Sequence, residues 1–156
     1  MRQHLSAASA EDTEACGARL ARALPAARPQ ALQLHLFGDL GSGKTTLARG
    51  FVQALGYHGV VRSPTYTLVE TYALGAVTVV HADLYRLRDP DEFEGLGLRD
   101  LAGGGHVWLI EWPQRAGHWL PAADIKVTLA AHPTFHSIEL QAPTPAGALW
   151  LAHLQA

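Results

Sequence analysis

A glycine-rich segment at positions 38–45 constrains the fold of this 156-residue chain more than any other feature. It reads Gly-Asp-Leu-Gly-Ser-Gly-Lys-Thr and matches the pattern G-x-x-x-x-G-K-[ST] without a gap. Apolar residues dominate positions 32–37 before it, which predicts a strand, and positions 44–55 after it carry a helical stripe that includes Leu47 and Phe51. A strand, a glycine loop and a helix in this order predict a phosphate-binding loop.

Each residue type in this loop suits the binding of phosphate and magnesium. Glycines let the backbone curl so that its N–H groups point at phosphate oxygens, and the helix that starts near Lys44 adds the positive end of its dipole. Lys44 can reach the terminal phosphates, and the Thr45 hydroxyl offers the hard oxygen ligand that Mg²⁺ prefers. The residues expected to contact the nucleotide are Gly38, Asp39, Leu40, Gly41, Ser42, Gly43, Lys44, Thr45 and Thr46.

Two carboxylates follow strand-like runs later in the chain. Glu111 directly follows the apolar residues 107–110, and Asp83 follows residues 79–82. Open α/β sheets bind ligands at the carboxyl ends of their strands, and phosphoryl transfer needs a carboxylate near the metal. We expect Lys44, Asp83 and Glu111 to carry the catalysis, and Thr45, Glu111 and Asp83 to hold Mg²⁺. Which of the two acids is the principal one stays open.

The nucleotide is expected to be ATP. Guanine-specific proteins with such a loop use an Asn-Lys-x-Asp motif, and this chain contains no asparagine. Trp112 comes directly after the strand that ends at Glu111, where an aromatic ring can lie against the base. Packing in the core is the alternative interpretation for this ring.

The remaining pattern indicates an α/β fold. Ser9 is a candidate cap for a helix over residues 10–24, and Pro90 starts a short helix that reaches about Leu98. Strands are expected over residues 77–80, 107–110, 125–129 and 137–140, and a closing helix over 145–154. We therefore expect one P-loop domain over residues 1–156, with a central, mostly parallel sheet flanked by helices.

Composition excludes several classes of protein. The net charge of −2 gives no support for a protein that grips nucleic acid directly by its phosphates. Cys16 is the only cysteine, so an internal disulfide is impossible. No stretch has the length of a membrane span, and the amino-terminal residues do not resemble a signal peptide. We expect a cytoplasmic protein that does not bind a membrane.

Five segments together go beyond a generic phosphate loop. In this order they closely resemble the TsaE family, formerly YjeE, the bacterial ATPases of tRNA threonylcarbamoyladenosine biosynthesis, and the resemblance runs from about Ser9 to Leu154. The segments are residues 38–46 (GDLGSGKTT), 63–69 (SPTYTLV), 81–87 (HADLYRL), 89–97 (DPDEFEGLG) and 110–113 (IEWP).

The resemblance implies a cytoplasmic, Mg²⁺-dependent ATPase that works in a complex with the TsaB and TsaD proteins. That complex forms N6-threonylcarbamoyladenosine at position 37 of tRNAs, so the ATPase would contact tRNA only indirectly, through the complex. The resemblance further implies that the ATPase resets or activates the complex. Lys44 and Thr45 match the family's phosphate and magnesium positions, Glu111 its metal-proximal glutamate, and Trp112 its aromatic residue near the nucleotide. Asp83 lies in the second of two switch-like segments, and residues 63–69 form the first.

The sequence departs from the family pattern at three places. Ala82 replaces a residue that is often bulky, and Gln114 replaces a frequent glutamate, so we assign no catalysis to Gln114. The turn at residues 132–136 reads His-Pro-Thr-Phe-His where arginine is common, which leaves a nucleotide contact from this turn open.

Two other functions stay open at this point. A small-molecule kinase would share the phosphate loop, but kinases of this size usually carry an arginine-bearing lid, and no insertion surrounds Arg86 and Arg88. A nucleotide-dependent switch would use residues 63–69 to sense the γ-phosphate. No motif identifies an arginine finger, so we expect slow hydrolysis by the isolated protein and stimulation by TsaB and TsaD.

Overall fold

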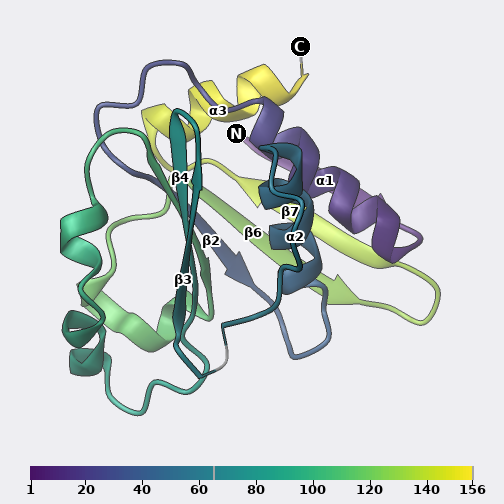
Figure 1. Ribbon diagram of the computed structural model, residues 1–156. Helices are drawn as coiled ribbons and strands as arrows, with labels where there is room; N and C mark the ends of the chain where they lie inside the picture. The colour runs from purple at the N-terminus through teal and green to yellow at the C-terminus, as the bar shows by residue number, and fades with distance from the viewer. Residues whose placement is uncertain (65, 156) are drawn as a thin grey trace.

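The protein, a computed structural model that describes residues 1–64 and 66–155, contains one seven-stranded sheet (Figure 1). Thr65, which belongs to the switch-like segment 63–69, and Ala156 lie outside the described residues. The strand order is β1-β7-β6-β2-β5-β4-β3. The strands are β1 (Arg2–Ala7), β2 (Leu32–Phe37), β3 (Val69–Leu74), β4 (Val77–Asp83), β5 (His106–Glu111), β6 (Ile125–Ala131) and β7 (His136–Gln141).

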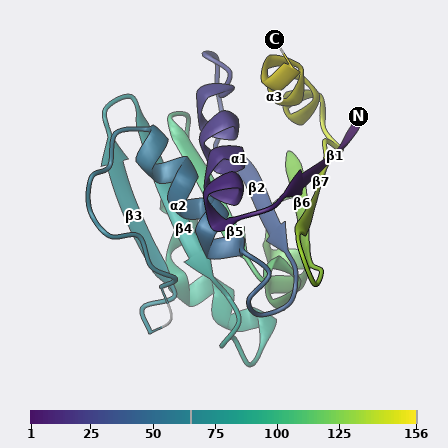
Figure 2. The same cartoon turned by 90° about the vertical axis from the view of Figure 1, so that its right-hand side faces the viewer.

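The centre of the sheet is parallel and its edges are antiparallel. The neighbours β6, β2, β5 and β4 run parallel, whereas β7 and β1 on one side and β3 on the other are added antiparallel. The sequence-based prediction of an α/β fold with a parallel centre is confirmed. The edge strand β1, visible beside β7 in Figure 2, was not expected. Its residues are mostly polar and partly exposed, so only the pairing with β7 identifies it.

Three helices cover one face of the sheet: α1 (Ala10–Arg22), α2 (Lys44–Ala54) and α3 (Pro145–Gln155) (Figure 1). The expected cap of α1 is present, because the Ser9 hydroxyl accepts the Asp12 N–H at 3.2 Å. The helix ends at Arg22, two residues earlier than predicted.

Trp150 ties α3 to the other two helices. Its indole N–H donates to the Leu20 carbonyl at 2.8 Å, and its ring meets Phe51 edge to face at 6.3 Å between centroids. All three residues are fully buried, so the three helices and the sheet share one apolar core.

Three short 3₁₀ segments cover part of the opposite face: η1 (Pro90–Leu96), η2 (Leu98–Leu101) and η3 (Pro113–Trp119). The short helix expected from Pro90 to about Leu98 is present from Pro90, but it is a 3₁₀ helix and ends at Leu96. Gly97, with φ of 72°, ends η1 in the left-handed region, which an α-helix cannot continue. Phe93 and Leu98 pack here in one cluster with Trp108 of β5.

Strand β5 is buried on both faces, as its unbroken apolar run predicted. Val107 and Leu109 belong to the cluster under the helices, and Trp108 and Ile110 to the cluster on the other face. The carboxyl ends of β2, β5 and β4 consequently meet at one edge of the sheet. Within the described residues, no helix has the length and apolar character of a membrane span.

Candidate nucleotide-binding site

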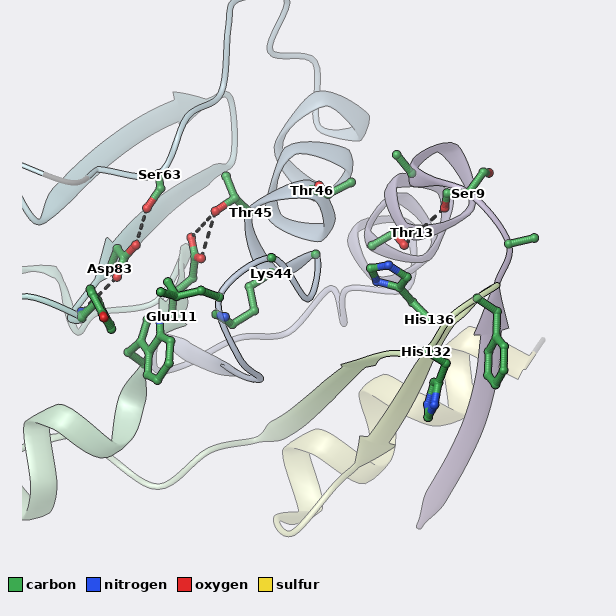
Figure 3. A pocket seen from close by; sticks show the side chains of 18 of the residues that line it. Ser9, Thr13, Lys44, Thr45, Thr46, Ser63, Asp83, Glu111, His132 and His136 are labelled. Atoms are coloured by element: carbon green, nitrogen blue, oxygen red, sulfur yellow. Dashed lines mark hydrogen bonds between the residues drawn. The ribbon is translucent and has the colours of Figure 1, made fainter.

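A cavity of about 720 Å³ opens at this edge of the sheet (Figure 3). The phosphate loop and the start of α2 form its floor, and residues that follow β4 and β5 form one wall. The start of α1 and the turn between β6 and β7 form the other. The volume lies in the range of small-molecule sites. The predicted residues that line it are Leu40, Gly41, Gly43, Lys44, Thr45, Thr46, Asp83, Glu111 and Trp112.

Two glycines of the loop stand where a side chain is disfavoured, Gly38 by its surroundings and its backbone and Gly43 by its backbone conformation. Gly38 has φ of 147°, and a Cβ atom there would lie 2.5 Å from the Leu129 carbonyl oxygen. Gly43 caps α2 with φ of 105°, in the left-handed region. The capping residue has no side chain to satisfy the first backbone N–H groups of α2, and the start of this helix lines the cavity, so these groups are available to an anion. The other predicted residues of the loop, Gly38, Asp39 and Ser42, are not among those that line the cavity.

The side chain of Lys44 folds back onto the backbone of the phosphate loop. Its ammonium donates to the carbonyl oxygens of Gly38 at 2.6 Å and Asp39 at 2.8 Å, and only 5% of the residue is exposed. Burial lowers the pKa of the ammonium, and the carboxylate of Glu111, followed by those of Asp83 and Asp39, opposes this shift. The charge is therefore held at the base of the cavity beside the candidate acids.

Glu111 and Thr45 contact each other across the floor of the cavity. The Thr45 hydroxyl lies 3.0 Å from Oε1 and 3.1 Å from Oε2 of Glu111 (Figure 3). The residue Glu111 is 2% exposed, so its carboxylate is buried except toward the cavity. His81 of β4 supplies a further partner, with its Nε2 atom 2.6 Å from Oε2.

Asp83 ends the neighbouring strand and pairs in register with Glu111. The Ser63 hydroxyl donates to its Oδ2 atom, and the Tyr85 N–H donates to Oδ1 at 3.0 Å. Its own N–H donates to the Leu68 carbonyl at 3.0 Å. Asp83 thus joins the candidate metal site to the loop that begins at Ser63, as the labelled side chains in Figure 3 make visible.

Trp112 lines the cavity next to Lys44. Its backbone adopts the left-handed conformation, with φ of 57°, directly after Glu111. The ring centroid is 4.7 Å from the Lys44 ammonium and 4.9 Å from the Tyr85 ring. This is a cation–π arrangement next to the phosphate loop. Contact between this ring and the base stays a prediction.

The turn between β6 and β7, left open by the sequence, lines the cavity together with the start of α1. His136 Nδ1 donates to the Ser42 carbonyl at 2.8 Å and so supports the phosphate loop from the start of β7. Figure 3 shows His136 beside Thr13 and Ser9, opposite the acids. No sequence motif connects His136 with Ser42, since the two positions are 94 residues apart.

The donor set fits Mg²⁺. Thr45 and Glu111 present oxygen atoms within hydrogen-bond distance of each other, and Asp83 adds a carboxylate on the adjacent strand. Among the described residues, no group of three or more His, Cys, Asp or Glu side chains is placed to hold a metal by itself. Mg²⁺ in nucleotide sites needs no such group, because one or two protein oxygens, phosphates and water complete its octahedron.

Comparisons with known proteins agree with this geometry. The family model of the threonylcarbamoyl adenosine biosynthesis protein TsaE matches residues 7–137. The tRNA threonylcarbamoyladenosine biosynthesis protein TsaE of Haemophilus influenzae is 47% identical over 118 residues, which are 76% of this chain and 75% of that protein. Its counterpart from Treponema pallidum is 34% identical, over 78% of this chain and 86% of that protein.

A solved structure has the same fold. The crystal structure of YdiB from Bacillus subtilis superposes with a TM-score of 0.76 at 27% sequence identity, over 99% of this chain and 95% of that one. Its likeness extends through β1 and α3, beyond the residues that the family model matches. Sequence, fold and site lead to one conclusion: this chain belongs to the TsaE family of threonylcarbamoyl adenosine biosynthesis proteins.

Proposed function

We propose that this protein binds ATP with Mg²⁺ and hydrolyses it as one component of the system that forms N6-threonylcarbamoyladenosine at position 37 of tRNAs. The observation that carries the proposal is the phosphate loop wrapped around Lys44 with the Thr45 hydroxyl against Glu111. The names of the relatives supply the pathway.

The roles of the residues follow from their positions. Lys44 exchanges its bonds to the Gly38 and Asp39 carbonyls for bonds to the terminal phosphates. Backbone N–H groups at the start of α2 hold the phosphate oxygens. Thr45 and Glu111 would hold Mg²⁺ directly or through water, and the bound metal would supply positive charge next to the phosphoryl group.

The partners in this proposal are TsaB and TsaD. Arg86 is the arginine among the described lining residues, and its guanidinium carbon lies 5.0 Å from the centre of the Tyr66 ring. A cation–π contact to an exposed ring is weak, so a partner protein could draw Arg86 away from Tyr66. A partner that moves Arg86, or supplies its own cation, would complete the site, and tRNA would be met only through the complex.

A nucleotide-dependent switch is a second candidate, favoured by one specific observation. Ser63 and Leu68, at the two ends of one loop, both hydrogen bond to Asp83, which lines the cavity. Such a loop can adopt different conformations with ATP and with ADP. Equal partner affinity with ATP, ADP and a non-hydrolysable analogue would exclude this candidate.

Calorimetric titration with ATP, with and without Mg²⁺, tests the proposal. Lys44→Ala should abolish measurable binding, whereas Lys126→Ala, which removes the chain's other lysine at an exposed position of β6, should bind as the wild type does. Undiminished ATP affinity in Lys44→Ala would contradict the site. Reconstituted tRNA modification that proceeds equally well without this protein would contradict the pathway.

A further inference from the structure

His81 is a buried polar residue in the middle of a strand, next to the candidate acid. It is 0% exposed, and neither apolar cluster includes it, although Val80 and Ala82 on either side belong to one. Because side chains alternate along a strand, His81 lies on the same face of β4 as Asp83, under α2. Its Nε2 atom is 2.6 Å from Oε2 of Glu111.

The hydrogen-bond partners of the ring fix the position of its proton. An ionised carboxylate accepts hydrogen bonds and cannot donate one, so Nε2 carries the proton and donates it to Glu111. Nδ1 is buried and has no hydrogen-bond partner among the described residues.

The two donors to Glu111 differ in how firmly they are held. Thr45 stands on the first turn of α2 and is itself proposed as a metal ligand. His81 stands on β4, which is hydrogen bonded in parallel to β5 and carries the residue that pairs with Glu111. The histidine is therefore the donor that stays in place when the Thr45 oxygen turns to the metal.

We propose that His81 is a positioning residue for the metal site: its Nε2–H holds Oε2 of Glu111 and so keeps the carboxylate oriented toward Thr45 and the cavity. This inference rests on the proposed function, because it assigns Glu111 to the metal. Hydrogen-bond partners of a metal-binding carboxylate set its orientation, and their loss costs roughly 10–100-fold in metal affinity or activity.

Two amide variants separate a hydrogen-bonding role from a packing role. The amide nitrogen of Gln overlays Nε2 of histidine, whereas that of Asn reaches only to the position of Nδ1. His81→Gln therefore keeps the donor to Glu111, and His81→Asn loses it. His35→Asn is a matched control, because His35 is also buried in a strand but its Nε2 atom lies 3.3 Å from Gln33 and not near the acids.

The measurement is Mn²⁺ binding by electron paramagnetic resonance, on protein saturated with a non-hydrolysable ATP analogue. His81→Asn should raise the Mn²⁺ concentration for half-saturation by roughly tenfold or more. His81→Gln and His35→Asn should stay close to the wild type. The affinity for the analogue without metal should be the same in all four proteins. In a Glu111→Gln background, His81→Asn should add no further loss.

The outcomes distinguish this inference from the proposed function. Wild-type protein that binds no Mn²⁺ with the analogue contradicts the proposed function. Normal Mn²⁺ affinity in His81→Asn, or equal losses in the Asn and Gln variants, overturns the positioning role while the metal site stands. If His81→Asn unfolds the protein and still does so in the Glu111→Gln background, the positioning role is also overturned. The histidine would then be needed for packing of the core and not for Glu111.

Discussion

Glu111 and Asp83 stand side by side at the ends of paired strands, but their surroundings differ. Glu111 is buried and accepts hydrogen bonds from Thr45 and His81, both within the core of the site. Asp83 is only half-buried and accepts from Ser63 and the Tyr85 backbone. We infer that Glu111 is the principal metal acid and that Asp83 couples the site to the loop.

Isosteric amides test this assignment. Glu111→Gln should raise the Mg²⁺ requirement of ATP binding by roughly tenfold or more, since it removes the charge nearest to Thr45. Asp83→Asn should have a smaller effect on Mg²⁺. Calorimetric ATP titrations at a series of Mg²⁺ concentrations measure both. A larger defect in Asp83→Asn would make Asp83 the principal acid.

His35 carries a pH-dependent part of the stability. Burial, with a smaller contribution from Lys126, lowers its pKa from 6.5 to about 4. Below pH 6.5 the unfolded chain therefore takes up a proton at His35 that the folded protein does not bind. The contribution of His35 to the free energy of unfolding is fully present above pH 6.5 and is lost as the pH falls toward 4. Lowering the pH from 7 to 5 should therefore reduce the free energy of unfolding by roughly 2 kcal/mol through this residue.

Urea unfolding of the wild type and of His35→Gln at pH 7 and pH 5 checks this value. The Gln variant keeps a donor for Gln33 but cannot take up a proton in this pH range. It should lose less stability than the wild type on acidification. Equal losses in the two proteins would show that His35 does not respond to pH in this way.

At the scale of elements, two glycines set how closely α1 and α2 cross. A Cβ atom on Gly17 would lie 2.0 Å from the Leu47 carbonyl oxygen, and one on Gly50 would lie 2.0 Å from the Glu14 carbonyl oxygen. Backbone therefore packs on backbone at the crossing. This contact fixes the two helices against each other, and the amino-terminal ends of both lie at the cavity.

Gly50→Ala should force the helices apart. Overpacking against backbone cannot be relieved by a rotamer change, so we expect a loss of roughly 3 kcal/mol. For a chain of this size that is about 6–12 °C in Tm. Gly95→Ala is the matched control, because nothing lies within 4 Å of its added Cβ atom and its φ is not in the left-handed region. Differential scanning calorimetry that finds similar Tm values for the two variants would contradict this role.

At the scale of the whole molecule, the proposed function makes rapid hydrolysis depend on partner proteins. We expect slow ATP hydrolysis by the isolated protein and stimulation by TsaB and TsaD together. An arginine that reaches the phosphoryl group can raise the rate by about 10³–10⁵-fold. Steady-state ATPase assays with each partner alone and with both measure the effect. Fast turnover that the pair does not change would refute the dependence on partners and leave the ATP site intact.

Much of the α/β fold could be predicted because its signals are local. The phosphate loop, the strand before it and the helix after it are each specified within about a dozen residues. The same holds for the Ser9 cap and for the doubly buried run that ends at Glu111. The 3₁₀ character of the Pro90–Leu96 segment was missed, because glycine positions and packing against Trp108 decide it and not helical periodicity.

The amino-acid sequence by itself determined which chemistry the site offers: glycines for phosphate, a lysine, a threonine hydroxyl and carboxylates at strand ends. Only the tertiary structure decided which of these groups meet. His81 contacts Glu111 across 30 positions, and His136 contacts the phosphate loop across 94. The edge strand β1 exists through its pairing with β7. Such contacts arise when strand register brings distant residues together, and register follows from the packing of the whole sheet and not from any local pattern.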